Sequence, residues 1–318
     1  MNIWTKLIHM KPYSDLNIAF LFAWMPDERW STPLSIVNES KRRNIKGRIY
    51  SLYDRNKQYT IAGLTALYQH IQSGQYKPDI IFHMDYGAFN HPLLDKQYFP
   101  NTYMVMEAGD DPQCFGNNSV KAYNFDLVLT PDLVSLQEYK KRDIDAIYWT
   151  HFADAMEGSE NPDIEPIYDV VSTRGDGDTP FLDELKSRLG NRFSNKRDFN
   201  ILQRDLLSTG KIVIQNSRYG EVSRRIFEGM YCKRMVMTDK LPSERGLDTL
   251  FTDGEDIVFY DSMEDAIEKI KFYSKRYEER ERIAYNGYQN VLNNHTSIQR
   301  FDAVLNKYYE FRNRNNNF

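Results

Sequence analysis

The stretch that decides the fold runs from Lys211 to Asp239 and reads KIVIQNSRYGEVSRRIFEGMYCKRMVMTD. Its first residues form an apolar run that predicts a buried strand ending at Gln215, and RMVMTD at its end predicts a second strand. Between them, a polar loop from Asn216 to Gly220 leads into a helix expected from Glu221 to Cys232. This strand–helix–strand order predicts a unit of parallel β-sheet.

The same alternation extends in both directions along the chain. Toward the N-terminus, we expect strands at Leu16–Pro26, Gly47–Asp54, Asp79–Asp85, Asn101–Pro112, Phe125–Asp132 and Ile144–Phe152, with helices at 32–43, 60–72 and 133–141. Around and beyond the quoted stretch, we expect strands at Tyr168–Gly177, Asp198–Gln203 and Gly254–Asp261, with helices at 181–189, 263–274 and 278–311. Apolar strands between helices indicate an α/β protein whose sheets are covered on both faces.

An acidic segment with two prolines, from Ala153 to Pro166, interrupts the alternation and predicts a linker. The 318 residues suit two domains of roughly 150 residues each. We therefore expect an N-terminal Rossmann-like domain over 1–157, a C-terminal Rossmann-like domain over 158–300, and a terminal helix with a frayed tail over 301–318. Two such domains face a cleft, and ligands bind beyond the carboxyl ends of the strands.

The composition excludes several classes of protein. Hydrophobic residues are 41% and charged residues 27%, as in globular proteins, and the net charge of -4 argues against a strongly basic nucleic-acid binder. The two cysteines, Cys114 and Cys232, lie far apart and have no metal-ligand spacing. No apolar run approaches the about 18 residues that span a membrane, and the first residues lack a signal sequence. We expect a cytoplasmic protein without a membrane partner.

The loop at Asn216–Gly220 is a candidate anion site. A helix that begins after it would offer unpaired backbone N–H groups, and Arg218, Arg224 and Arg225 could bind a diphosphate in bidentate fashion. Glu228, one helical turn later, could accept hydrogen bonds from sugar hydroxyls. The alternative is an ordinary surface helix with Glu/Arg pairs at helical spacing.

Several short motifs occur in a fixed order after about residue 105. They are GDDP (Gly109–Pro112), FDLVLTPD, YDVVSTRG, Arg225–Glu228, Thr238–Asp239, Gly254–Glu255, Tyr260–Asp261, His295–Thr296 and Arg300. Together they resemble the CgeB-type (spore-maturation-type) group 1 glycosyltransferases. The resemblance implies a GT-B fold, which consists of two Rossmann-like domains facing a cleft, with the C-terminal helix crossing back over both domains.

The same resemblance implies an enzyme that takes a nucleotide-diphosphate sugar as co-substrate and holds it mainly on the C-terminal domain. In related retaining enzymes, two glutamates bind the donor, and Glu228 matches the second of them, which binds ribose hydroxyls. Position 220 corresponds to the first and is glycine here, with Glu221 as the nearest acid. The donor-binding residues that we predict are Glu228, Arg225, Arg224, Arg218, Asn216, Ser217, Tyr219, Gly220, Glu221, Arg174 and Tyr260.

Neither a metal nor a resident cofactor is expected. Asp176 and Asp178 have the spacing of an Asp-x-Asp metal motif, but the glycines beside them favour a turn. A helix N-terminus and arginines can instead stabilise the charge that develops on a diphosphate leaving group. The prediction is therefore a metal-independent hexosyl- or pentosyltransferase.

On the acceptor side, strand ends of the first domain supply the candidates for a catalytic base. Asp111, Asp110 and His83 are the predicted catalytic residues, with Asp85, His151 and Asp154 as other strand-end candidates. Turn or capping roles for the acids and a buried structural role for the histidines are the alternatives. The basic clusters Lys41–Arg43 and Lys140–Arg142 suit helix C-termini or a polyanionic acceptor.

The acceptor stays open among a hydroxymethylated DNA base, a soluble glycan and a protein. Two other functions would suit the same features. One is a nucleotide-sugar epimerase or hydrolase, and the other is a non-catalytic nucleotide-sugar-binding partner subunit. The sequence contains neither a Gly-x-Gly-x-x-Gly turn after its first strand nor a Walker A loop, which disfavours dinucleotide and P-loop enzymes.

Overall fold

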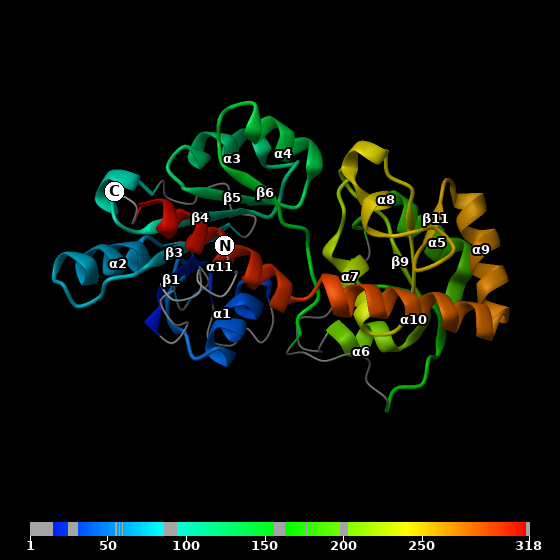
Figure 1. Ribbon diagram of the computed structural model, residues 1–318. Coiled ribbons are helices and arrows are strands. Elements are labelled where there is room, and N and C mark those ends of the chain that lie inside the picture. Colours follow the sequence, from blue (N-terminus) through cyan, green and yellow to red (C-terminus); the bar gives the residue numbers. More distant parts are fainter. Residues whose placement is uncertain are drawn as a thin grey trace, which may run out of the picture. The chain divides into compact units, whose positions relative to one another are not determined.

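The computed structural model describes residues 15–24, 31–54, 56, 58, 60–85, 94–155, 163–175, 177–197 and 203–315 (Figure 1). Its contacts divide the chain into two compact units. Unit 1 comprises Met1–Trp149 and Ile298–Phe318, and unit 2 comprises Thr150–Ser297. The middle of the expected linker, 156–162, lies outside the described residues.

Unit 1 contains a six-stranded parallel sheet in the order β2-β1-β3-β4-β5-β6. Its strands are β1 (Asn17–Phe22), β2 (Lys46–Ser51), β3 (Ile80–Asp85), β4 (Tyr103–Ala108), β5 (Leu127–Thr130) and β6 (Ala146–Tyr148). Its helices are α1 (Thr32–Arg42), α2 (Ala62–Gln72), the 3-10 helix η4 (Lys96–Tyr98), α3 (Phe115–Ala122), α4 (Leu133–Lys140) and most of α11 (Ser297–Asn315). Helices connect successive parallel strands, as the sequence predicts.

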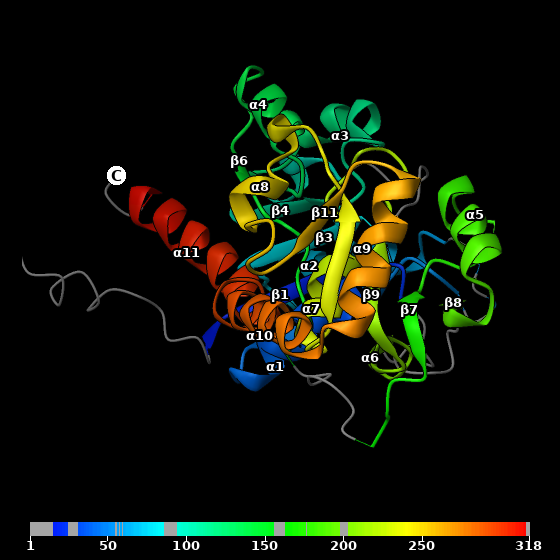
Figure 2. The same ribbon diagram turned by 90° about the vertical axis from the view of Figure 1, so that its right-hand side faces the viewer.

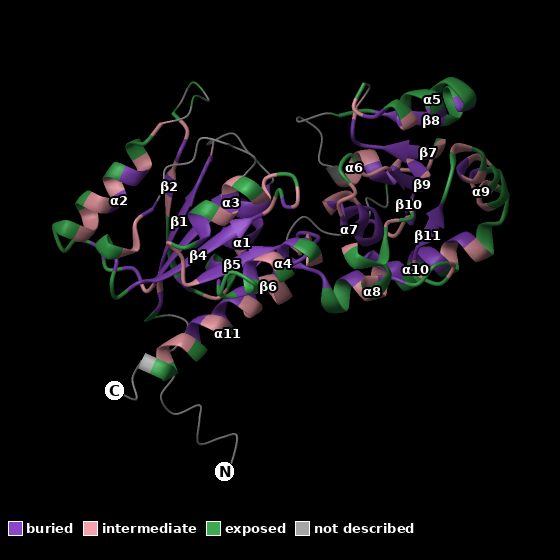
Figure 3. Cartoon of the chain, turned by 90° about the horizontal axis from the view of Figure 1, so that it is seen from above, coloured by how far each residue is buried: buried purple, intermediate pink, exposed green. Residues whose placement is uncertain are grey.

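Local sequence explains where the first helix of unit 1 begins. Ser31 caps α1 by accepting the N–H of Leu34 at 3.3 Å, and Pro33 occupies the first turn, where it needs no N–H partner. Along β1, Ile18 to Phe22 are fully buried because both faces of the sheet are covered (Figure 3).

The expected C-terminal helix over 278–311 is two helices, α10 (Tyr277–Asn294) and α11. Between them, the backbone at His295–Ser297 hydrogen-bonds to Ala153 in a short parallel bridge, which takes it out of helical conformation. After this break, α11 packs on unit 1. Trp149 Nε1 donates to the carbonyl of Arg300 at 2.9 Å, and Arg43 pairs with Asp302.

Unit 2 contains a five-stranded parallel sheet in the order β11-β10-β9-β7-β8 (Figure 2). Its strands are β7 (Tyr168–Ser172), β8 (Phe193–Asn195), β9 (Gly210–Gln215), β10 (Met235–Asp239) and β11 (Val258–Tyr260). Its helices are α5 (Pro180–Leu189), η5 (Gly190–Arg192), α6 (Gln203–Ser208), α7 (Arg224–Tyr231), η6 (Ser243–Arg245), α8 (Leu247–Leu250), α9 (Met263–Lys275) and α10.

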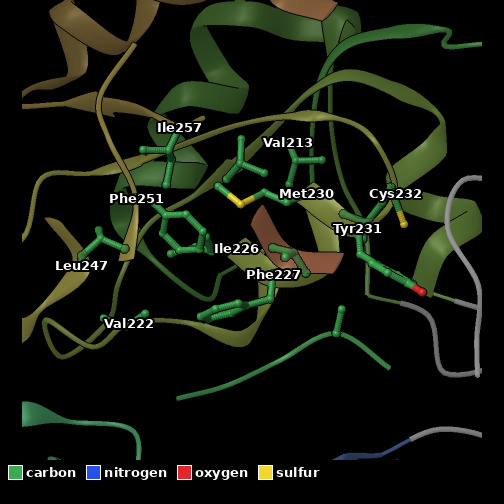
Figure 4. Close-up of a cluster of buried hydrophobic side chains, with 14 of the residues drawn as sticks. Val213, Val222, Ile226, Phe227, Met230, Tyr231, Cys232, Leu247, Phe251 and Ile257 are labelled. Carbon is green, nitrogen blue, oxygen red and sulfur yellow. The ribbon is translucent and has the colours of Figure 1, made fainter. Parts of the chain in front are cut away.

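Successive residues of β9 face two separate apolar clusters. Ile212 and Ile214 pack with α5 and α9, whereas Val213 packs with α7 (Figure 4). Gly229 lets α7 approach the sheet closely, because a Cβ at this position would lie 2.9 Å from Val236 Cγ2 and 3.0 Å from Val213 Cγ1. The apolar run at the start of KIVIQ is therefore a strand buried on both faces, as its composition predicts.

Two expectations for unit 2 are wrong in detail. The strand expected at Asp198–Gln203 is replaced by β8, which lies just before it; residues 198–202 lie outside the described part, and Gln203 begins α6. The helix expected from Glu221 begins at Arg224, because Gly220 has φ = 71° and Glu221 closes a turn instead. Helices α3 and α8 were not expected.

In the described part of the chain, no helix is long and apolar enough to cross a membrane.

Candidate functional site

Polar residues follow the carboxyl ends of the strands in unit 2. All five strands are parallel, so these ends lie on one edge of the sheet. We call this the unit 2 edge and define it as residues 173–175, 177–178, 195–197, 215–223, 239 and 260. In parallel α/β sheets, this edge is where ligands bind.

Arg174, two residues after β7, is the centre of a charged network at the unit 2 edge. Its side chain is only 7% exposed, and its two terminal nitrogens contact different carboxylates. Nη1 donates to Asp178 Oδ2 at 3.0 Å, and Nη2 donates to Glu221 Oε1 at 2.9 Å. Arg218, which is largely exposed, pairs with the other oxygen of Asp178. Two predicted donor-binding arginines are thus brought together with Glu221, and Asp178 joins them.

Glu221 organises the loop that precedes α7. Its carboxylate accepts the backbone N–H of Tyr219 at 2.7 Å and that of Arg218 at 3.3 Å, in addition to Arg174. Burial by itself raises the pKa of Glu221, but these N–H groups and the Arg174 charge outweigh it, so that the pKa lies below its usual value. Glu221 is therefore ionised and holds the turn that contains Tyr219 and Gly220.

Residues at the ends of β10 and β11 hydrogen-bond to the same loop and to the residue before it. Asp239 at the end of β10 accepts the Ser217 N–H at 2.8 Å and also the Ser217 hydroxyl. The Tyr260 hydroxyl donates to the carbonyl of Gln215 at 2.7 Å, and its ring stacks on Phe181. Tyr260 is 2% exposed, and burial raises the pKa of its phenol. From within the core, Tyr260 thus supports the start of the loop at Gln215 and Asn216.

Helix α7 carries the remaining predicted donor-binding residues. Ser223 caps it by accepting the N–H of Arg225, whose side chain is half-buried. Arg224 Nε lies 2.7 Å from Glu228 Oε1, one turn along the helix, and both side chains are mostly buried. The Glu228 charge and burial raise the pKa of the neighbouring Cys232 thiol to about 12, burial being the larger cause. Glu228 is thus a buried, charge-balanced carboxylate in the first two turns of α7.

A polar cavity of about 560 Å³ opens at the unit 2 edge. It is lined by Arg174, Gly175, Gly177, Asp178, Asn195, Lys196 and Arg197. Lys196 and Arg197 follow β8 and are exposed, so the cavity holds three cationic side chains and one carboxylate. Asn195 bonds the backbone N–H and carbonyl of Gly175 at 3.0 and 2.7 Å, which joins β8 to the turn after β7.

Asn195, Lys196 and Arg197 were not expected at the site, because the strand predicted at Asp198–Gln203 begins five residues later than β8 does. The signal was present in RFSNKR, where an aromatic residue and alternating polarity precede two cations. The expected turn at Asp176–Asp178 is confirmed by positive φ angles at Gly175 (92°) and Gly177 (75°), while Asp176 itself lies outside the described residues. Among described residues, no cluster of His, Cys, Asp and Glu has the arrangement of a metal site.

In unit 1, Asp111 is held by three neutral donors. Its carboxylate accepts Asn118 Nδ2 at 3.0 Å, Thr130 Oγ1 at 2.9 Å and the Tyr139 hydroxyl at 3.0 Å. The residue is 3% exposed, and burial raises its pKa to about 6 although the hydrogen bonds lower it. Asp111 thus connects the end of β4 with α3, β5 and α4.

The other acceptor-side candidates have different surroundings. Asp110 is exposed, on the same turn as Asp111. His83 lies within β3, 1% exposed, and its ring stacks on Phe125 with centroids 5.8 Å apart. Asp85 ends β3, but its side chain lies outside the described part. His151 and Asp154 come after β6 and belong to unit 2.

The unit 2 edge is chemically suited to bind an anion. Its cavity offers the guanidinium groups of Arg174 and Arg197 and the ammonium group of Lys196. The buried carboxylate of Glu228 adds an acceptor for hydroxyl groups on the neighbouring helix.

Comparison with known sequences gives one family match. Residues 190–306 match the model of a family described as glycosyl transferase-like. The matched stretch includes the loop at Asn216–Ser223, helix α7 and the pocket residues that follow β8. No curated protein matches the sequence.

Comparison with solved structures gives matches along almost the whole chain. Anabaena HepE in complex with UDP and glucose has a TM-score of 0.60 at 13% identity, covering 93% of this chain and 100% of that chain. Sucrose-phosphate synthase from Thermosynechococcus elongatus has a TM-score of 0.63 at 11% identity, covering 93% and 99%. A glycosyltransferase from Rickettsia africae has a TM-score of 0.58 at 12% identity, covering 92% and 98%. The chain thus has the GT-B fold, with two Rossmann-like sheets, and its residues 190–306 carry a glycosyl transferase-like sequence.

Proposed function

We propose that the protein is a glycosyltransferase that moves a sugar from a nucleotide-diphosphate donor to an acceptor hydroxyl. The observation that carries this proposal is the cationic cavity at the unit 2 edge, where Arg174, Lys196 and Arg197 surround the glycine turn after β7. The family match over residues 190–306 supports the same activity. The predicted CgeB-type subfamily is part of this proposal.

In this mechanism, the cavity holds the diphosphate and stabilises the negative charge that forms when the bond to the anomeric carbon breaks. The guanidinium of Arg174 supplies a fixed fork for phosphate oxygens, and Lys196 and Arg197 supply further positive charge. Glu228 accepts hydrogen bonds from donor hydroxyls, and Arg224 pairs with it at 2.7 Å. The acceptor hydroxyl oxygen forms a bond to the anomeric carbon as the bond to the diphosphate breaks, and the hydroxyl proton passes to the departing diphosphate or to water.

Two finer points belong to the same proposal. The reaction is proposed to need no metal, because Arg174, Lys196 and Arg197 line the cavity and supply positive charge for the diphosphate. The acceptor is a hydroxyl on a hydroxymethylated DNA base, a glycan or a protein. UDP-glucose is the first donor to test, since the similar Anabaena HepE was solved with it.

The test measures thermal stabilisation of the protein by a panel of nucleoside diphosphates and nucleotide sugars, in the presence of EDTA. A ligand at a concentration 100 times its dissociation constant should raise the free energy of unfolding by about 2.7 kcal/mol. Glu228→Gln keeps the size of the side chain and should weaken binding of the nucleotide sugar. Glu184→Gln removes the same charge from an exposed side chain of α5, and it should leave binding of the nucleotide sugar unchanged.

Each outcome separates the proposal from its alternatives. Stabilisation by one nucleotide family, followed by sugar transfer in an acceptor screen that includes hydroxymethylated DNA, supports the transferase. Turnover of the donor without any acceptor indicates an epimerase or hydrolase, and binding without turnover indicates a partner subunit. No stabilisation by any nucleotide rejects the donor site, and binding lost in EDTA rejects metal independence.

A further inference from the structure

Asp178 lies where an anionic ligand of the cavity would bind. Two predicted donor-binding arginines are already engaged by this residue, since Arg174 Nη1 donates to Asp178 Oδ2 at 3.0 Å and Arg218 pairs with Oδ1. The Asp178 side chain is 11% exposed and lines the cavity. A phosphate at Arg174 would thus meet a carboxylate of the same charge at close range.

The two acids of the network are attached in different ways. Glu221 is held by backbone N–H groups of its own loop, at Tyr219 and Arg218, so it cannot leave without opening that turn. Within the described residues, the side chain of Asp178 is bonded only by the two arginine side chains. A phosphate can replace both of these contacts, because it accepts the same guanidinium hydrogen bonds.

The backbone around Asp178 permits such an exchange. Asp178 follows Gly177, whose φ is 75°, and precedes Thr179, the cap of α5. It therefore belongs to a glycine turn and to neither a strand nor a helix. A glycine turn can reorient an attached side chain with less backbone strain than a strand or helix.

We propose that Asp178 is a stand-in for the donor phosphate, which holds Arg174 and Arg218 in the ligand-free protein and is displaced when the donor binds. The inference rests on the proposed function. In exchange, Arg218 loses its partner on the turn after β7 and becomes available to the ligand. Donor binding is thereby coupled to the loop at Asn216–Ser223, and Asp178 lowers donor affinity while speeding release of the nucleoside diphosphate product.

The experiment titrates UDP, and separately inorganic pyrophosphate, into the wild type, Asp178→Asn and Glu184→Gln in a calorimeter. Asp178→Asn keeps the side-chain size and removes the competing charge. We expect it to bind UDP about tenfold more tightly than the wild type, since a like charge close to the ligand is removed. Glu184→Gln makes the same charge change on the outside of α5 and should stay within about twofold of the wild type, because salt screens exposed charges.

Thermal unfolding supplies a second readout that does not depend on turnover. Without ligand, Asp178→Asn should melt below the wild type, because Arg174 and Arg218 lose their partner. Saturating UDP should then raise its melting temperature by more than it raises that of the wild type. If Asp178→Asn fails to fold, Asp178→Ser is measured in its place.

The outcomes distinguish this proposal from the proposed function. Equal or weaker UDP binding by a folded Asp178 variant, with wild-type binding intact, overturns the stand-in role and leaves the donor site standing. Binding of neither pyrophosphate nor any nucleoside diphosphate of the panel by the wild type rejects both. Tighter binding by Glu184→Gln to the same extent overturns the stand-in role as well, because the effect would then come from net charge alone.

Discussion

The acids that follow strands in the two units are stabilised by opposite means. In unit 2, Asp178 and Glu221 face arginines, and the pKa of Glu221 lies below its usual value. In unit 1, Asp111 faces only neutral donors from Asn118, Thr130 and Tyr139, and burial raises its pKa to about 6. In both units the acids lie in glycine-containing turns that follow strands of a parallel sheet.

The difference shows that position at a strand end does not decide what a carboxylate does. A carboxylate paired with arginines forms contacts that a phosphate can replace. A carboxylate enclosed by side chains of three different elements fixes those elements to one another. We therefore regard Asp111 as a residue that holds the turn after β4, and the unit 2 edge as the place where ligand exchange occurs.

The largest effect is expected from Arg174→Met, which removes the only buried cation between Asp178 and Glu221 in the described network. Asp178 would then keep only its contact with Arg218, and Glu221 only the backbone N–H groups of its loop, so the free energy of unfolding should fall by about 3–5 kcal/mol. Urea denaturation at neutral pH measures this change. Arg218→Met, at a largely exposed side chain, is the control and should have a much smaller effect. If Arg174→Met lowered the free energy of unfolding no more than the control does, the stabilising role of the Arg174 network would be contradicted.

The next prediction concerns the pH dependence of Asp111→Asn. Since folding raises the pKa of Asp111 from 3.8 to about 6, the stability that it contributes is present below about pH 4 and is lost as the pH rises through 6. Relative to Asp111→Asn, the wild type should lose up to about 3 kcal/mol between pH 4 and pH 7, measured by urea denaturation. Asp145→Asn, at an exposed acid of unit 1, should show no such trend. A difference that is constant across this range would disprove the raised pKa.

A smaller effect is expected where α7 touches the sheet of unit 2. Gly229→Ala forces a Cβ against Val236 and Val213 and should destabilise by about 1–3 kcal/mol. Combining it with Val213→Ala should recover part of the loss, which a double-mutant cycle measures. Gly116→Ala on α3 of unit 1 has no atom within 4 Å of the new Cβ and should be neutral or stabilising. Equal effects at both glycines would contradict the close approach of α7.

The smallest effect is expected at exposed ion pairs of the same residue types. Arg188 contacts Glu184 and Glu264, but all three side chains are largely exposed. Arg188→Gln should leave the melting temperature unchanged at physiological salt, because exposed pairs are screened. A clear drop would mean that burial is not what separates the Arg174 network from surface pairs.

Much of the fold is predictable because its signals are local. Ser31 and Pro33 mark the start of α1, and the apolar residues of KIVIQ mark β9, since capping and burial on both faces depend on neighbouring residues alone. The end of β8 was missed because a three-residue strand carries little pattern. The break at His295 was missed because it depends on hydrogen bonds to Ala153, far away in sequence.

The candidate site was predictable only in its parts. Arg174, Arg218 and Glu221 were identified individually, and the structure brings them together. Asp178 was seen only as a turn residue. Arg174 lies four residues before it, but Arg218 lies 40 residues after it and reaches it only through the pairing of β7 with β9. Sequence separation therefore hid the charge pairing on which the proposed ligand exchange depends.

The most direct test of the account is whether the cationic cavity of unit 2 binds the donor diphosphate. Lys196 and Arg197 line it from exposed positions, so the double variant Lys196→Gln/Arg197→Gln can lose binding without losing the core. Calorimetric titration with UDP should show at least about tenfold weaker binding than the wild type, and a weaker salt dependence. The matched variant Lys186→Gln/Arg188→Gln, on the outside of α5, should bind as the wild type does. Unchanged affinity in the cavity variant would contradict the account.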